Sequence, residues 1–324
     1  GADASRLCEA GCVTRRDLDL VLLGATGFVG RLTAEHLGAT APDGVRIGLA
    51  GRNPERLEDV RSSLGGRAAD WPLVVVDTTD RAALRELAES TSVVVTTVGP
   101  YAKYGMPVVE ACATAGTHYA DLTGEVLFVR DSMDHWDAVA RETGARIVHS
   151  CGFDSVPSDL GVLLVAEAAA ADGAGTLEQT RLVVRSFSGG ISGGTIDSAR
   201  TMAMAVADDR SLAKVLGDPY ALSPHRADEP DVALPSDTAP IRRNGTGAWV
   251  GPFVMASYNT RIVRLSNTLQ DWAYGRTFSY GEEMVFGHDL LAPVRAAAAT
   301  AGVGVAVAGM AFGPTRSLID RFLP

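Results

Sequence analysis

Three glycines at a spacing of three residues are the first sign of chemistry in this chain. Gly24, Gly27 and Gly30 occur in the segment GATGFVG, between the apolar run LVLL and a helix-like pattern. Glycines at a strand-to-helix turn permit a tight bend and let the main chain approach a phosphate, and the N–H groups at the helix start bind anions. We therefore predict that this turn holds the pyrophosphate of a dinucleotide; the alternative is a packing turn without a ligand. The other residues expected at the turn are Thr26, Phe28 and Val29.

The residues after the second apolar run decide which dinucleotide is expected. Sites for NAD usually carry Asp or Glu at this point, whereas IGLAGRNPERL has Arg52 and no carboxylate before Glu55. The planar guanidinium of an arginine can donate two charge-assisted hydrogen bonds to a 2′-phosphate. We predict NADP(H), bound by Arg52 with Asn53 and Arg56; the alternative is a solvated arginine at a helix start.

Two further strand ends are expected to meet the same cofactor. Asp77 closes the run PLVVVD and is placed at the adenine edge. The fourth run, SVVVTTVGP, ends in four residues that should border the nicotinamide, because ligands of parallel α/β sheets bind beyond the carboxyl ends of the strands. These four are Thr97, Val98, Gly99 and Pro100.

Tyrosines near the later strand ends are the predicted proton donors. Hydride transfer needs a substrate held against the nicotinamide, and a phenol can donate a proton to a developing enolate. We rank Tyr101 and Tyr119 first; the alternative is that both only pack and form hydrogen bonds within the fold. The Tyr-x-x-x-Lys pair of short-chain dehydrogenases does not occur after these strands. Asp121 and Glu125 are expected to cap the following helix, with Thr123 at its N-cap.

The histidines and cysteines show no metal-ligating pattern. His36, His118 and His149 do not pair at the i, i+4 spacing of helical ligands and are interpreted as structural. Cys8 and Cys12 have no second Cys or His pair at a matching spacing, so no metal is predicted. The four cysteines also give no disulfide framework, which favours a reducing cytoplasm.

The elements that must position these residues alternate between strand and helix. Amphipathic segments separate the apolar runs LVLL, VRIGLAG, PLVVVD, SVVVTTVGP, THYADLT and ARIVHSCG. Successive strand–helix units imply a parallel sheet that is covered on both faces and wound right-handed. The predicted fold class is α/β, a Rossmann-type doubly wound parallel sheet with a second α+β domain.

A change in character near Gly152 divides the chain. We expect four parts: an N-terminal extension over 1–17, an NADP-binding Rossmann domain over 18–155, an α+β substrate domain over 156–289 and an apolar C-terminal helix over 290–324. Proline and charge predict a long loop over 217–247. Strands are expected in AWVGPFVMASYNTRIVRLSN and RTFSYGEEMVFG. The segment SGGISGGTIDSAR is expected either to grip a substrate phosphate or to bend before a helix that starts near Thr195.

Composition argues against a nucleic-acid partner and bears on location. The 324 residues are 46% hydrophobic and carry a formal net charge of -10, with 39 acidic and 29 basic residues, so a basic footprint for a polyanion is missing. The start of the chain lacks the apolar run of a signal peptide, and we expect a cytoplasmic protein. Residues 296–315 are uncharged but rich in alanine and glycine. A buried helix is expected there, with a peripheral anchor at the inner face of the cell membrane or a full span as alternatives.

Several motifs together resemble the saccharopine dehydrogenase-like oxidoreductases. They are GATGFVG, AGRN, TTVGPYAKYGMPVVEACATAGTHYADLTGE, HSCGFDSVPSDLG and SGGTIDSAR. Within that family the chain, from about Asp17 to its end, is similar to the actinobacterial branch of trans-acting enoyl reductases. The resemblance implies NADP(H) and the reduction of a carbon–carbon double bond in a lipid, polyketide or prenyl-type chain that a separate synthase or acyl carrier holds. Members of the family continue beyond RSLIDRFLP, which puts the final part of the second domain in question.

Two other classes of function stay open on the sequence alone. A dehydrogenase of saccharopine-type amino-acid adducts would need cationic residues for carboxylates. The sequence offers Arg185, Arg200, Arg242 and Arg243 for that purpose. A protein that binds NADP(H) without turnover would need only the cofactor site. A homodimer is a further expectation.

Overall fold

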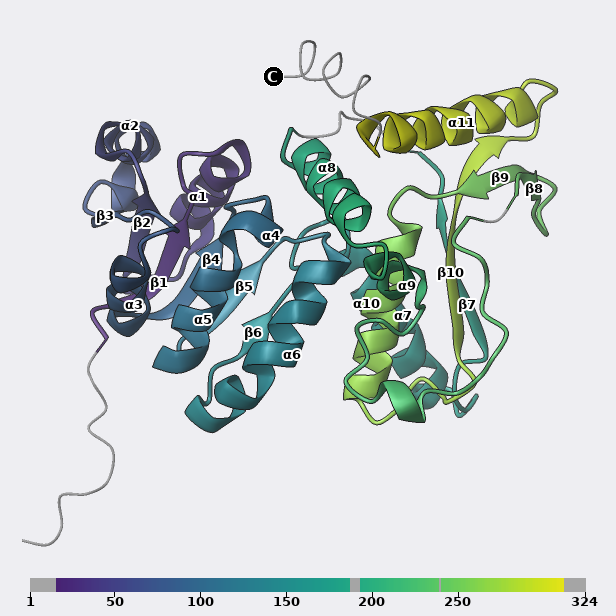
Figure 1. Ribbon diagram of the computed structural model, residues 1–324, viewed down its shortest axis with the longest axis horizontal. Coiled ribbons are helices and arrows are strands. Elements are labelled where there is room, and N and C mark those ends of the chain that lie inside the picture. Colours follow the sequence, from purple (N-terminus) through teal and green to yellow (C-terminus); the bar gives the residue numbers. More distant parts are fainter. Residues whose placement is uncertain (1–15, 187–192, 239, 312–324) are drawn as a thin grey trace, which may run out of the picture.

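Two sheets and their helices make up the part of the chain that the structure describes. The computed structural model describes residues 16–186, 193–238 and 240–311. In Figure 1 the first sheet lies beside the second, and helix α8 (Gly193–Asp208) lies between the two groups of elements. Some residues with sequence-based expectations lie outside the described part; these are Cys8, Cys12, the glycine-rich stretch 187–192 and residues 312–324.

The first sheet has six parallel strands in the order β3-β2-β1-β4-β5-β6. The strands are β1 (Leu18–Leu23), β2 (Ile47–Gly51), β3 (Leu73–Val75), β4 (Thr91–Thr96), β5 (His118–Asp121) and β6 (Ile147–Val148). The chain moves outward from β1 to β3, then returns and moves outward the other way from β4. The strand order therefore reverses between β1 and β4, and the predicted Rossmann-type fold class is confirmed.

Helices cover both faces of this sheet. They are α1 (Phe28–Thr40), α2 (Pro54–Leu64), η1 (Gly66–Ala68), α3 (Arg81–Ser90), α4 (Tyr101–Tyr104), α5 (Met106–Ala115) and α6 (Val126–Thr143). Neighbouring residues of β1 face different layers: Val21 packs in the cluster that holds Leu84 of α3, whereas Leu22 packs in the cluster that holds Leu57 of α2. Burial on both faces explains why β1 is a continuous apolar run.

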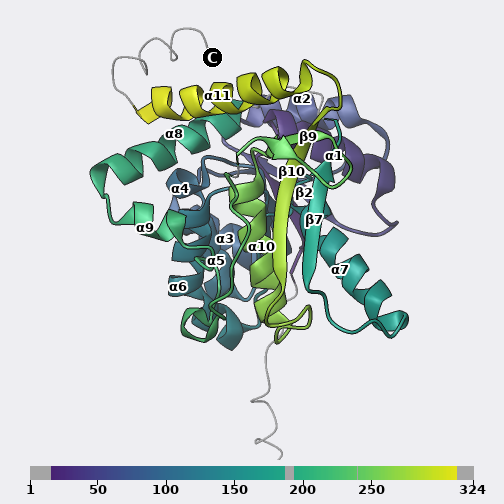
Figure 2. The same cartoon turned by 90° about the vertical axis from the view of Figure 1, so that its right-hand side faces the viewer.

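The second sheet is mixed, with four strands in the order β7-β10-β9-β8. Strands β7 and β10 are parallel, and the other neighbours are antiparallel. The elements of this half are α7 (Val156–Ala171), β7 (Gln179–Val184), α9 (Leu212–Gly217), η2 (Arg226–Asp228), β8 (Arg242–Arg243), β9 (Trp249–Pro252), α10 (Ala256–Leu269), β10 (Ser279–Gly287) and α11 (Ala292–Ala311). Figure 2 shows α11 across the upper end of this sheet, where it contacts α8 and β9.

One element of the second half differs from the sequence-based expectation. We predicted strand throughout AWVGPFVMASYNTRIVRLSN, but only β9 is a strand and the rest forms α10. The prediction was wrong because the buried side of α10 is largely polar, so the apolar spacing that indicates a helix is missing. Asn259, Thr260, Arg261 and Arg264 are each 5% exposed or less.

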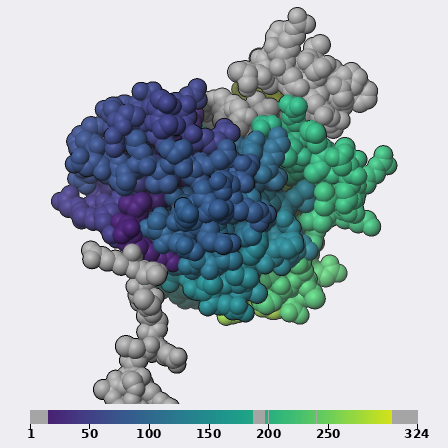
Figure 3. Space-filling view, turned by 60° about the vertical axis from the view of Figure 1, so that its left-hand side comes forward, coloured from purple at the N-terminus to yellow at the C-terminus, as the bar shows by residue number. Residues whose placement is uncertain are grey.

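A shared apolar cluster joins the two halves. Tyr101 and Phe128 of the first half belong to it together with Leu222, Tyr258 and Ile262 of the second. Figure 3 shows the green surface of the second half directly against the blue and teal surface of the first. The relative position of the halves is therefore set by core packing. Within the described residues, no helix has both the length and the apolar character needed to cross a bilayer.

Candidate cofactor and reaction site

Two glycines of the GATGFVG turn are required by the packing of the protein itself. Gly24 has a φ of 90°, and a Cβ atom there would lie 2.8 Å from both Thr97 Oγ1 and Val98 Cγ2. A Cβ atom at Gly30 would lie 2.1 Å from the carbonyl oxygen of Gly24. The first glycine therefore lets the end of β4 approach the turn, and the last lets α1 approach β1.

Gly27 is different, because the described protein atoms leave room for a side chain there. Its φ of -74° suits any residue, and a Cβ atom would meet only the Gly24 carbonyl oxygen, at 3.4 Å. Gly27 is the N-cap of α1, which has no side-chain cap and no acidic residue in its first turn. The open surface and the N–H groups at this helix start fit a pyrophosphate, which needs close approach to the main chain.

The residues predicted at the adenosine end lie after β2 and β3. Arg52 is exposed. The side chain of Asn53 accepts a hydrogen bond from Arg56 N at 2.7 Å, so it caps α2. Asp77 accepts bonds from the N–H and the hydroxyl of Thr79, both at 2.8 Å. These bonds lower the pKa of Asp77, and the nearby charge of Arg52 lowers it further. Contacts of these residues with NADP(H) stay a prediction.

The end of β4 lies directly against the glycine turn. Thr97 N donates to Leu23 O at 2.9 Å, and Thr97 Oγ1 donates to Gly24 O at 3.1 Å. Val98 N donates to the hydroxyl of Thr96 at 3.2 Å. Because β1 and β4 flank the point where the strand order reverses, their carboxyl ends open the crevice in which such sheets bind ligands. The structure thus brings the predicted pyrophosphate turn and the predicted nicotinamide edge, residues 97–100, together.

The two tyrosines predicted as proton donors are buried and bonded to other protein groups. The hydroxyl of Tyr101 donates to Thr96 O at 3.1 Å and accepts from Leu122 N at 3.4 Å. The hydroxyl of Tyr119 donates to Asp121 Oδ2 at 2.9 Å. Burial raises the pKa of both phenols, and the charge of Asp121 raises it further. Both hydroxyls are committed to internal bonds in this arrangement, and their role as acids stays a prediction.

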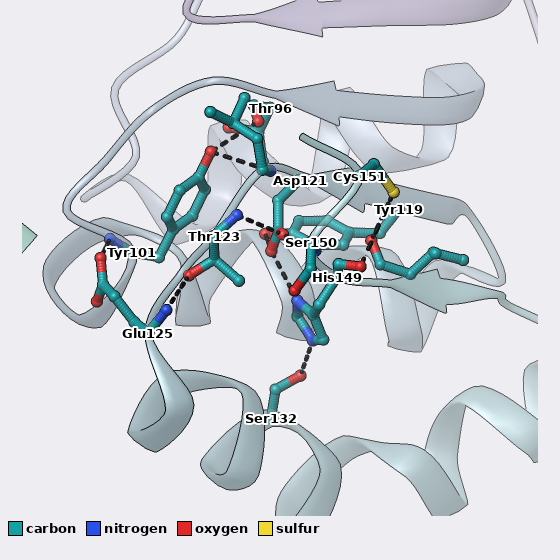
Figure 4. A network of polar contacts seen from close by, with 12 residues as sticks. Thr96, Tyr101, Tyr119, Asp121, Thr123, Glu125, Ser132, His149, Ser150 and Cys151 are labelled. Carbon is teal, nitrogen blue, oxygen red and sulfur yellow. Dashed lines mark hydrogen bonds and ion pairs between the residues drawn. The ribbon is translucent and has the colours of Figure 1, made fainter. Parts of the chain in front are cut away.

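Asp121 is the centre of the polar network in Figure 4. Its Oδ1 accepts from Thr123 N at 3.0 Å and from Ser150 N at 2.9 Å. Its Oδ2 accepts from Tyr119 and lies 2.6 Å from His149 Nδ1. The carboxylate therefore ties the end of β5 to the end of β6, and its role is broader than the helix cap that we expected.

The cap of α6 also differs from expectation. The N-cap of this helix is Glu125, and the hydroxyl of Thr123 accepts a bond from Glu125 N at 3.1 Å. The Glu125 carboxylate itself turns to the start of α4, where it accepts from Tyr101 N at 2.9 Å and from Ala102 N at 2.8 Å. Ser198 of α8 donates to the same carboxylate at 2.6 Å. No local pattern in the sequence indicates this contact, because Glu125 and Ser198 are 73 positions apart and lie in different elements.

Residues of α10 reach the same junction from the second half. The hydroxyl of Tyr258 contacts Ser150 Oγ, and Asn259 Nδ2 donates to Asp154 O at 2.8 Å. Asn259 Oδ1 accepts from Ser155 Oγ at 3.0 Å. Sequence reasoning missed these residues because it assigned them to a strand.

One further histidine and two of the arginines considered for carboxylate binding have partners within the protein. His118 Nδ1 accepts from Arg146 N at 3.1 Å. Among the residues that the structure describes, no three His, Cys, Asp or Glu side chains gather as a metal site would require. In the second sheet, Arg242 donates to Glu283 at 2.6 Å and Arg243 lies over the ring of Trp249, 5.1 Å from its centroid.

Comparison with known proteins identifies the class of the first domain. Residues 20–148 match the family model of the saccharopine dehydrogenase NADP binding domain. The protein therefore carries an NADP-binding oxidoreductase domain of the saccharopine dehydrogenase type. This confirms NADP(H) as the cofactor and oxidoreductase as the class of enzyme.

Relatives that match most of the chain define the family more closely. A trans-acting enoyl reductase of Mycobacterium ulcerans (strain Agy99) is 47% identical over 320 residues, which cover 96% of this chain and 76% of the relative. A trans-acting enoyl reductase of Mycobacterium tuberculosis (strain ATCC 25618 / H37Rv) is 48% identical over 299 residues, which cover 89% of this chain and 70% of the relative. The chain belongs to the family of trans-acting enoyl reductases. A solved structure, apo saccharopine dehydrogenase (L-Glu forming) from Saccharomyces cerevisiae, matches at a TM-score of 0.39 and 18% identity over 52% of this chain and 34% of that chain.

Proposed function

We propose that the protein reduces a carbon–carbon double bond of an acyl, polyketide or prenyl-type chain that a separate synthase presents. The family supports the reaction, since the relatives carry the name trans-acting enoyl reductase. The observation that carries the proposal is the contact between the ends of β1 and β4, at the point where the strand order of the first sheet reverses. There the open Gly27 turn lies next to residues 97–100, as a dinucleotide bound across the sheet requires.

The residues of the chain bind and orient the reactants. When bound, NADPH supplies the hydride. The first-turn amides of α1 and the bare main chain at Gly27 hold the pyrophosphate, and Arg52 binds the 2′-phosphate. Residues 97–100 border the nicotinamide. The start of α10 and helix α8 reach the same edge of the sheet from the second half: Tyr258 contacts Ser150 after β6, and Ser198 donates to Glu125 after β5.

A group that delivers a proton to the substrate completes the reaction. Tyr101 and Tyr119 remain our predicted donors, although both hydroxyls are engaged in the arrangement described. Lys103 offers an exposed alternative on the same turn, with its side chain 50% exposed and Nζ 4.0 Å from Asp197 Oδ2 of α8. A Lys103→Met variant that retains full turnover would exclude this alternative.

An assay with purified protein tests the proposed function. We expect NADPH oxidation with an α,β-unsaturated thioester of N-acetylcysteamine, and no reaction with the saturated thioester. Reduction of NADP+ by saccharopine, without activity on the enoyl thioester, would support the adduct dehydrogenase instead. Arg242 and Arg243 do not favour that alternative, because both are engaged within the second sheet. NADPH binding without turnover of either substrate would indicate a binding protein.

A peripheral membrane contact fits one apolar surface of the second half. Leu290, Leu291 and Val294 at the start of α11 are 94%, 64% and 62% exposed. Exposed apolar side chains on a helix can enter the headgroup region of a bilayer. We expect Leu290→Ser/Leu291→Ser to reduce sedimentation with phosphatidylglycerol-containing vesicles, whereas Leu164→Ser, an exposed leucine on α7, should not. Equal sedimentation of both variants with the unaltered protein would exclude the contact.

A further inference from the structure

Glu125 is a buried carboxylate with donors from both halves of the molecule. It is 3% exposed. Tyr101 N and Ala102 N donate to its two oxygens from the first half, and Ser198 Oγ donates to Oε1 from the second half. Burying a charge is costly unless hydrogen bonds compensate for lost water. The three bonds are therefore interdependent, since loss of one weakens the compensation for the charge.

The first two donors connect Glu125 to the nicotinamide edge. Tyr101 and Ala102 begin α4, which directly follows residues 97–100. The carboxylate therefore fixes the direction in which the chain leaves this segment. At the other end of α4, Gly105 lets α4 pack closely against α6, because a Cβ atom at this position would lie 2.7 Å from the ring of Phe128. Figure 4 shows Glu125 beside the main chain of Tyr101.

The third donor connects Glu125 to the second half. Ser198 lies on α8, which begins at Gly193 and packs against α4. The preceding residue, Asp197, faces Lys103 of α4 at 4.0 Å, with both side chains about half exposed. An exposed ion pair contributes little. The bond of Ser198 to the buried Glu125 carboxylate is therefore the stronger link between α8 and α4.

We propose that Glu125 is a positioning residue for the reductase reaction, and that Ser198 makes its effect depend on the docking of α8. The proposal rests on the proposed function for the step that it serves. When α8 docks, its hydroxyl completes the set of donors around the carboxylate, and the carboxylate holds α4 and residues 97–100 in place at the nicotinamide. The substrate-side helix and the cofactor-side loop are thus set together by one buried group.

Three variants test this link: Ser198→Ala, Ser198→Thr and Glu125→Gln, with Ser90→Ala as the matched control. Ser90 also lies on a helix, but its hydroxyl bonds to Leu87 O within α3. Hydrogen exchange of the Tyr101 and Ala102 amides is the first measurement. We expect exchange about 10-fold faster or more in Ser198→Ala and Glu125→Gln, from the loss of a hydrogen bond to a charged group. Ser198→Thr keeps the hydroxyl and should restore protection, and Ser90→Ala should not alter it.

Cofactor and turnover measurements separate positioning from a general loss of structure. In Ser198→Ala, the Kd for NADPH should stay within about twofold, because the predicted contacts with the pyrophosphate and the 2′-phosphate do not involve Ser198. The emission of bound NADPH should change, and kcat with the enoyl thioester should fall about 10-fold or more. A parallel rise in Kd and fall in kcat would indicate general damage and overturn the proposal.

Two further outcomes would also overturn it. These are unchanged amide exchange in Ser198→Ala, and faster exchange with unchanged emission of bound NADPH. If the unaltered protein reduces no substrate, the proposed function fails, whereas exchange and emission still decide whether Glu125 and Ser198 position the nicotinamide edge. If Glu125→Gln does not fold, Ser198→Ala and Ser198→Thr decide the result alone.

Discussion

The two ends of the predicted cofactor site are built in different ways. At the predicted pyrophosphate end, the groups expected to bind are main-chain atoms within a stretch of seven residues from Gly24 to Gly30. The predicted nicotinamide end depends on contacts between distant parts of the chain. Tyr101 and Glu125 are 24 positions apart, Glu125 and Ser198 are 73 apart, and Ser150 and Tyr258 are 108 apart.

We therefore expect changes at one end to affect cofactor binding and changes at the other to affect the reaction. A glycine turn works by the absence of side chains, so the groups expected to bind the pyrophosphate come from one short stretch, although the end of β4 packs against it. The other end works by buried polar groups that hold one another in place, and such groups are costly when one partner is lost. Changes at the first end should therefore alter affinity for the cofactor, whereas changes at the second should alter the arrangement of the halves.

The largest effect is expected at the glycine turn, the predicted pyrophosphate end of the site. Gly27→Val should abolish detectable NADPH binding, because the side chain would occupy the surface where the pyrophosphate approaches the main chain. The thermal midpoint should be nearly unchanged, since a Cβ atom there meets only one protein atom, at 3.4 Å. Isothermal titration calorimetry and circular dichroism measure the two quantities.

Gly30→Ala is the matched comparison for this prediction. A Cβ atom there would lie 2.1 Å from Gly24 O, and overpacking of this kind should lower the free energy of unfolding by about 3 kcal/mol or more. If Gly27→Val retained NADPH binding, or if the two variants were equally destabilised, the distinction between a ligand glycine and a packing glycine would be wrong.

A smaller effect is expected at Arg52. Arg52→Ala should weaken NADPH binding by about 1.5–3 kcal/mol, the range for hydrogen bonds to charged groups, and leave NADH binding nearly unchanged. Titration of both coenzymes measures the difference, and Arg85→Ala, an exposed arginine on α3, serves as the control. Equal losses for NADPH and NADH would contradict a contact with the 2′-phosphate.

The smallest effect concerns Asp159, a partly buried carboxyl of the second half. Asp159 Oδ1 is buried without a hydrogen-bond partner, and burial raises the pKa of this group from its ordinary value of 3.8. When the pKa of a carboxyl is higher in the folded than in the unfolded protein, its contribution to the free energy of unfolding is greatest at a pH below the unfolded-state pKa. That contribution is lost as pH rises through the folded-state pKa. Asp159→Asn should therefore increase the free energy of unfolding by about 1 kcal/mol at pH 7.

The gain should shrink toward zero as pH falls below the ordinary pKa of 3.8, because the aspartate is then protonated in both the folded and the unfolded state. Denaturant unfolding at several pH values measures it. Glu167→Gln is the control, since Glu167 lies on the same helix but is exposed. A gain that is constant with pH, or a loss at pH 7, would show that the charge of Asp159 is not the cause.

Much of the first half could be predicted because its signals are local. Strands such as β1 are buried on both faces and are therefore continuous apolar runs, and helices such as α2 begin at a cap like Asn53 followed by proline. The same reasoning failed at α10. Its buried residues, among them Asn259 and Arg261, are polar because they bond to α7 and to the loop after α9. No local pattern shows those partners.

The sequence by itself determined the strand, turn and helix at which we predict the pyrophosphate, because glycines at fixed spacing after an apolar strand permit a tight bend and a close helix wherever the chain folds in this way. The tertiary structure alone decided the reaction end. There, Glu125 turns away from the helix that it begins and bonds to α4 and α8. A buried carboxylate accepts hydrogen bonds from whichever donors the fold brings near it. Which donors come near depends on the packing of elements that are far apart in the sequence, so no local pattern predicts them.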